Sequence, residues 1–113
     1  ILAFGPMLHS VTDIAEQLNA TVVDMRWVKP LDEQLLQTLA QNHSHFVTVE
    51  DSCLAGGAGS AVNEWFAKNN LTPHVLSLGL PDQFIDHGDV AALLALHGLS
   101  VDAIASKIRD FVA

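Results

Sequence analysis

The stretch VEDSCLAGGAGSAVNEWF, from Val49 to Phe66, decides the fold that the sequence predicts. An apolar run meets two acids, Glu50 and Asp51, three glycines follow within four positions, and a helix-like pattern comes next. A strand, a glycine-rich turn and a helix in this order are typical of α/β proteins and of loops that bind phosphate at the start of a helix. The sequence therefore raises the question whether this loop binds an anion or only shares that outline.

Outward from this stretch, short apolar runs alternate with amphipathic segments along the whole chain. Strands are predicted at residues 1–4, 21–25, 45–50 and 74–79, and helices at 7–18, 30–39, 58–66, 89–96 and 100–111. Since parallel neighbours need crossover helices, this alternation predicts a single α/β domain over residues 1–113, with a three-layer α/β/α architecture around an open, mainly parallel sheet. The runs at 21–25 and 74–78 fit strands that are buried on both faces.

Several residues suit the ends of the predicted helices. Pro30 suits the start of the second helix, while Asp89 and Ser100 suit the N-caps of the last two. The inner face of the last helix is assigned to Val101, Ile104, Ala105 and Ile108, with Phe111 as a further candidate.

Composition and charge exclude several classes of partner. The 113 residues are half hydrophobic and 16% charged, as expected of a folded domain with one core. The net charge of -8, with only five Lys and Arg, disfavours nucleic acid and anionic membranes, because both require clustered positive charge. No apolar run approaches the ~20 residues of a membrane-spanning helix, and no signal peptide is recognisable.

The single cysteine and the first residue bear on where the protein works. Because Cys53 stands alone, an internal disulfide and a cysteine-based metal site are excluded, and a reducing cytoplasm is the expected location. The sequence starts with Ile1 inside an apolar run, from which we expect a fragment of a longer protein.

The glycine loop departs from the known phosphate-binding motifs. A Walker A loop needs a lysine where Ser60 follows Gly59, and a dinucleotide fingerprint needs a third small residue where Val62 stands. Glu50 and Asp51 would repel a phosphate. The sequence therefore favours a structural role for the glycines, which permit close backbone approach, with a bound anion at the start of the helix as the open alternative.

Other candidate sites are incomplete. His43 and His45 are two residues apart but have no evident third metal ligand, and Asp86 beside His87 fits a local turn better than an acid–base pair. Cys53 has no basic neighbour in sequence that would activate its thiol as a nucleophile. The residues alone predict an acidic α/β domain without a self-contained active site, which serves a larger protein.

Three longer motifs resemble a known family. They are VVDMRWVKPLDEQLL at 22–36, VTVEDSCLAGGAGSAVNEW at 47–65 and LGLPDQFIDHG at 78–88. In order and spacing they resemble the C-terminal domain of the 1-deoxy-D-xylulose-5-phosphate synthases. The first two also occur, loosely, across the wider transketolase C-terminal domain class, which includes the pyruvate dehydrogenase beta subunit. The third points to the synthases, and Asp51 departs from them where a second Glu is frequent.

The resemblance implies a role within a larger enzyme. Such a synthase condenses pyruvate with D-glyceraldehyde 3-phosphate, releases carbon dioxide, uses thiamine diphosphate and Mg²⁺, and works as a cytoplasmic homodimer. Its product is a precursor of isoprenoids, thiamine and pyridoxal. Cofactor, metal and catalytic side chains belong to the two upstream domains. No catalytic, cofactor-binding or metal-binding residue is therefore assigned here, and the isolated chain is expected to be inactive.

The resemblance also implies a sheet topology. The family's domain has a mixed sheet whose first, antiparallel strand would lie upstream of Ile1. The remaining strands would lie in the order two, one, three, four.

A face for packing on the upstream domains or on the second subunit is expected at the glycine loop and at residues 80–88, because such contacts concentrate in loops that join rigid elements. Phe84 and Ile85 place two large apolar side chains in that second, otherwise polar loop; the alternative is that they fold into the domain's own core. The residues assigned to this interdomain face are Glu50, Asp51, Gly56, Gly57, Gly59, Asp82, Phe84, Ile85 and His87.

A salt bridge is also predicted within the domain. Arg26 should pair with Asp32 or Glu50, because the segments that carry all three emerge at the same edge of a parallel sheet. Two other assignments stay open at this point. One is a pyruvate dehydrogenase beta-type domain that docks a partner, and the other is a stand-alone flavodoxin-like binding module.

Overall fold

The computed structural model describes residues 1–81 and 90–113. Its elements, in chain order, are β1 (Leu2–Ala3), the 3-10 helix η1 (Gly5–Met7), α1 (Leu8–Leu18), β2 (Val23–Asp24), α2 (Glu33–Asn42), β3 (His45–Cys53), α3 (Ala58–Lys68), β4 (His74–Leu80), α4 (Val90–Leu96) and α5 (Val101–Val112). In this described part of the chain, no helix is both long enough and apolar enough to cross a membrane.

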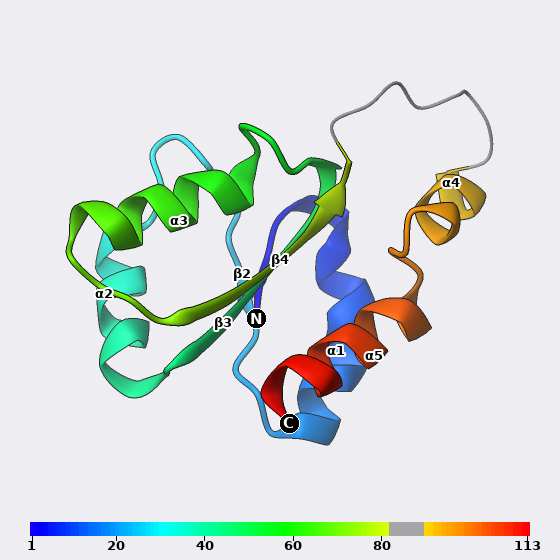
Figure 1. Cartoon of the computed structure of the whole chain (residues 1–113), viewed down its shortest axis with the longest axis horizontal. Helices are drawn as coiled ribbons and strands as arrows, with labels where there is room; N and C mark the ends of the chain where they lie inside the picture. The colour runs from blue at the N-terminus through cyan, green and yellow to red at the C-terminus, as the bar shows by residue number, and fades with distance from the viewer. Residues whose placement is uncertain (82–89) are drawn as a thin grey trace.

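The four strands form one parallel sheet in the order β2-β1-β3-β4. Helices α2 and α3 cover one face, and α1 and α5 cover the other (Figure 1). Both the predicted three-layer α/β/α class and the predicted strand order are therefore confirmed. The predicted upstream antiparallel strand stays a prediction.

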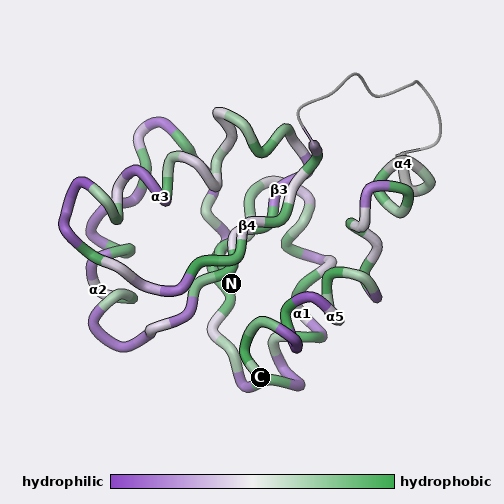
Figure 2. Tube along the Cα trace, viewed as in Figure 1, coloured by the Kyte–Doolittle hydropathy of each residue, from purple (hydrophilic) through white to green (hydrophobic). Residues whose placement is uncertain are grey.

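Alternation along the strands sends neighbouring residues to two separate cores. Leu2 and Phe46 join the core under α2 and α3, whereas Ala3 and Val47 join the core under α1 and α5. In Figure 2, hydrophobic residues lie along the middle of β4, and hydrophilic ones lie on the outer turns of α2 and α3.

The two outer strands differ from the prediction. The apolar runs at 21–25 and 74–78 predict burial on both faces, but β2 and β4 are the edges of the sheet and most of their residues are only half-buried. Short apolar sequences indicate strands but not their position in the sheet. The buried strands are the two central ones: β1 is buried throughout, and β3 is buried from Phe46 to Glu50.

Two helix assignments are also corrected. Pro30 does not open α2, which begins at Glu33, because the Asp32 carboxylate accepts the Leu35 N–H at 3.1 Å and caps the helix. Val101 does not face the core but is 52% exposed. Ser100 caps α5 as predicted, since its hydroxyl accepts the Ala103 N–H, whereas Asp89 lies outside the described residues.

Candidate functional site

The junction of β3 and α3 is the predicted anion site, and a carboxylate of the chain itself fills it. Helix α3 begins at Ala58 after Gly57, which offers no side-chain cap, so its first backbone N–H groups need acceptors. The Glu50 carboxylate supplies them: Oε1 accepts the Ala58 N–H at 2.9 Å and Oε2 accepts the Gly59 N–H at 2.6 Å. The Ser52 hydroxyl donates to Oε1 at 2.8 Å.

Strand geometry explains why Glu50 points at the helix. Phe46, Thr48 and Glu50 alternate onto the face of the sheet under α3. The regular pairing of β3 with β4 ends at Val49, and an irregularity follows before Cys53 pairs again. Glu50 is the first residue of β3 in this irregular part. Glu50 is only 1% exposed, so its negative charge is held by backbone N–H groups and the positive end of the α3 dipole.

The glycines leave the space that this carboxylate occupies. A Cβ at Gly57 would overlap Glu50 Oε1 and the Cys53 carbonyl oxygen, and a Cβ at Gly59 would lie 2.7 Å from Thr48 Oγ1. A Cβ at Gly79, on the neighbouring strand, would lie 3.0 Å from Glu50 Cγ. The predicted structural role of the loop glycines is confirmed. The loop resembles a phosphate-binding site because it also holds an anion at the start of a helix, but that anion is the Glu50 carboxylate of the chain itself.

Beside the Glu50 carboxylate lies a small polar cluster. Thr48 Oγ1 is buried, and it is the one such side-chain atom without a hydrogen-bond partner among residues 1–81 and 90–113. On the next strand, Ser77 Oγ accepts a hydrogen bond from Asn63 of α3 at 3.3 Å. The sheet therefore presents polar groups of β3 and β4 to the N-terminal part of α3, whereas Trp65 and Phe66 further along α3 pack in the apolar core.

The residues predicted for an interdomain face divide into three groups. Glu50 and Gly59 are buried inside the domain, which corrects their assignment as contact residues. Asp51 and Gly56 are exposed at this edge and stay predictions, and Gly57 is half-buried against Glu50. Asp82, Phe84, Ile85 and His87 lie outside the described residues.

Arg26 does form an ion pair, but with a different partner from those predicted. Its Nε lies 3.8 Å from Asp24 Oδ2. Asp24 ends β2 and lies only two residues before Arg26, whereas Asp32 is engaged as the α2 cap and Glu50 at α3. The pair is largely exposed and is worth about 0–1 kcal/mol.

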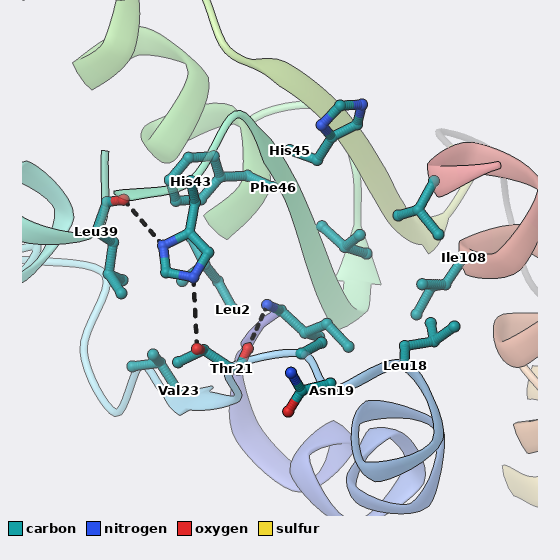
Figure 3. A pocket seen from close by; sticks show the side chains of 14 residues that line it. Leu2, Leu18, Asn19, Thr21, Val23, Leu39, His43, His45, Phe46 and Ile108 are labelled. Carbon is teal, nitrogen blue, oxygen red and sulfur yellow. Dashed lines mark hydrogen bonds between the residues drawn. The ribbon is translucent and has the colours of Figure 1, made fainter. Parts of the chain in front are cut away.

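The opposite end of the sheet, where β1 and β3 begin, contains a pocket that the sequence did not reveal. It has a volume of about 180 Å³ and is lined by apolar side chains such as Leu18, Leu39 and Ile108, together with His43 (Figure 3). His43 Nδ1 lies 3.0 Å from the Leu39 carbonyl oxygen and Nε2 lies 3.4 Å from Thr21 Oγ1. Its lining comes from segments distant in sequence, so no local motif marks it.

The histidine pair considered as a metal site is separated. Both line the pocket, but they have different partners: His43 contacts the Leu39 carbonyl oxygen, while His45 stacks on His74 of the neighbouring strand with ring centroids 4.8 Å apart. In the part of the chain that the structure describes, no three His, Cys, Asp or Glu residues are grouped as metal ligands.

Comparison with known proteins identifies the domain. Residues 1–104 match the family model described as transketolase, C-terminal domain. Curated relatives named 1-deoxy-D-xylulose-5-phosphate synthase are 52% identical over 110 residues in Burkholderia pseudomallei and 53% identical in Ralstonia nicotianae. These alignments cover 97% of this chain but only 17% of each relative.

A solved structure shares the fold. The chain described as "Split gene transketolase, inactive beta4 tetramer" matches with a TM-score of 0.84 and 31% identity, over 96% of this chain and 37% of that one. Sequence and structure thus agree on the same domain type. Because the family match extends over most of its length, the chain belongs to the transketolase C-terminal domain family.

Proposed function

We propose that this chain is the C-terminal domain of a thiamine-diphosphate-dependent synthase that joins pyruvate to D-glyceraldehyde 3-phosphate with loss of carbon dioxide, in the cytoplasm. The observation that carries the proposal is the 52% identity to curated synthases along 110 of the 113 residues. The role of the domain is structural. It is a rigid unit that packs on the catalytic domains and, within a homodimer, on the second subunit.

The described residues do not fit the cofactor. Thiamine diphosphate brings a diphosphate and Mg²⁺, and the N-terminus of α3 is the part of this fold whose outline suits a phosphate. Its N–H groups at Ala58 and Gly59 are taken by Glu50, and a second anion there would face a buried carboxylate. The proposal therefore places the cofactor and its metal on other domains, and no catalytic step is derived from this chain.

Two alternatives are weighed against this proposal. The family match disfavours a flavodoxin-like carrier. A pyruvate dehydrogenase beta-type domain would share the fold, but the curated relatives at 52–53% identity carry the synthase name, which favours the synthase. The structural neighbour is described as a tetramer, and we propose only that this domain also contributes to an assembly.

The test uses the full-length polypeptide and the 113-residue chain side by side. With pyruvate, D-glyceraldehyde 3-phosphate, thiamine diphosphate and Mg²⁺, the full-length protein should form 1-deoxy-D-xylulose 5-phosphate and carbon dioxide, while the isolated chain should stay at background. Full-length protein that instead transfers an acetyl group to a lipoyl acyltransferase would support the dehydrogenase alternative. Turnover by the isolated chain would overturn the structural role.

A further inference from the structure

The loop that follows β2 carries the most unusual exposed side chain of the described structure. Trp27 is 70% exposed, whereas Trp65, the other tryptophan, is 6% exposed in the core under α3. A tryptophan left in water costs free energy that burial in an interface would recover, and tryptophans are enriched at the energetic centres of interfaces.

Positive charge flanks this tryptophan on both sides. Arg26 and Lys29 are exposed neighbours of Trp27, and they are two of only five Lys and Arg in a chain of net charge -8. The ion pair of Arg26 with Asp24 is 3.8 Å long, beyond hydrogen-bonding distance. The guanidinium therefore keeps its donors available for a partner.

The surface around the loop is hollowed on both sides. One hollow of about 290 Å³ is lined by Trp27 with the apolar Met25, Pro30 and Leu35, and by the charged Asp24, Arg26 and Asp32. A second of about 430 Å³ is lined by Val28 together with residues of the glycine loop. An exposed aromatic side chain that borders a hollow offers the shape complementarity that protein interfaces use.

We propose that residues 26–29, here called the Trp27 ridge, dock onto an apolar, carboxylate-bearing surface elsewhere in the same full-length polypeptide. This rests on the proposed function in requiring further domains. Two observations favour that occupant. The curated relatives extend far beyond the aligned region, which is 17% of their length. The four residues of the ridge also carry two positive charges, Arg26 and Lys29, and no negative one, so the ridge itself complements carboxylates, although Asp24 and Asp32 lie beside it.

Hydroxyl-radical footprinting of Trp27 tests the docking directly. Its modification rate should fall about fivefold or more from the 113-residue chain to the full-length protein, because interface centres exclude water. Trp65 should be protected in both and reports that the domain is folded. Leu96, which is 77% exposed on α4, serves as the exposed reference.

Charge reversal tests the chemistry of the partner surface. In the full-length protein, Arg26→Glu combined with Lys29→Glu should restore most of the Trp27 modification, whereas Lys68→Glu, an exposed lysine on α3, should leave it protected. If the double variant is insoluble, the Trp27 modification rate is measured in the single variants Arg26→Glu and Lys29→Glu instead.

Three results would overturn the inference. The first is equal Trp27 modification in the short and full-length proteins. The second is protection that charge reversal at Arg26 and Lys29 does not relieve. The third is protection in the 113-residue chain that rises with its concentration together with a dimer mass, since this would assign the ridge to a second copy. Synthase activity is measured separately, so loss of the proposed function and loss of the docking are distinguishable.

Discussion

Replacing Glu50 should destabilise the domain more than replacing any neighbouring acid. Glu50→Gln keeps the size of the side chain but removes its charge and turns one acceptor oxygen into a donor. That donor would face a backbone N–H of Ala58 or Gly59, both of which now donate to the carboxylate. One buried N–H would lose its acceptor, and the hydrogen bond from Ser52 would compete for the remaining oxygen.

The magnitude follows from the bonds that are lost. Hydrogen bonds to charged groups contribute about 1.5–3 kcal/mol each, and breaking a buried ionic contact costs about 3–5 kcal/mol. We therefore expect Glu50→Gln to lower the free energy of unfolding by about 2–4 kcal/mol. This is a large part of the ~5–15 kcal/mol that holds a domain folded. Loss of an ordinary helix cap would cost about 0.5–2 kcal/mol.

Urea unfolding followed by Trp65 fluorescence reports directly on the helix that Glu50 caps, because Trp65 is buried on α3. Trp27→Phe in all samples removes the signal of the exposed tryptophan. The matched control is Asp51→Asn, the adjacent and exposed acid, which should change stability by less than about 0.5 kcal/mol. If Glu50→Gln and Asp51→Asn unfold at the same urea concentration, the built-in anion does not hold α3 in place.

Three further substitutions test the same region and one helix end. Gly59→Ala should cost about 1–3 kcal/mol in urea unfolding, and Thr48→Ala in the same chain should recover part of it, because the new Cβ would crowd Thr48 Oγ1. Thr48→Val should raise the free energy of unfolding by about 1 kcal/mol, because it removes a buried hydroxyl without a partner. The control Thr12→Val, on the exposed face of α1, should not raise it. A lower urea midpoint for Thr48→Val than for the unchanged chain would contradict this. Ser100→Ala should cost about 1 kcal/mol in thermal unfolding through loss of the α5 cap, and an unchanged melting temperature would show that the cap is dispensable.

The architecture is predictable because it depends on local patterns. The strand–glycine–helix order at 49–66 and the alternation around it are enough for the α/β class, and Ser100 is recognisable as a cap from its place before a periodic run. Position within the sheet is not predictable in the same way. Residues 21–25 and 74–78 are as apolar as a central strand, and only the order of pairing makes β2 and β4 the edges.

The candidate site is predictable in kind but not in its partners. Strand alternation from Phe46 through Thr48 already indicates that Glu50 points toward the same face, and three nearby glycines indicate a close approach. The groups that the carboxylate binds lie eight and nine residues further on, and the sequence does not specify the turn that brings them back. The predicted pairing of Arg26 is wrong for a related reason, since the sequence does not reveal that the more distant acids are already engaged as helix caps.

A built-in anion at the start of α3 separates the residues that stabilise this domain from those free to bind others. Because Glu50 accepts the Ala58 and Gly59 N–H groups, α3 is fixed to β3 without any ligand, and these two N–H groups are not available to a partner. We therefore expect any contact with other domains at the carboxyl ends of the strands to involve exposed residues, such as Asp51, Gly56 and the Trp27 ridge. Substitutions at Glu50 and Gly59 should therefore change stability in the isolated chain and in the full-length protein alike. Substitutions in the ridge should matter only where the rest of the polypeptide is present.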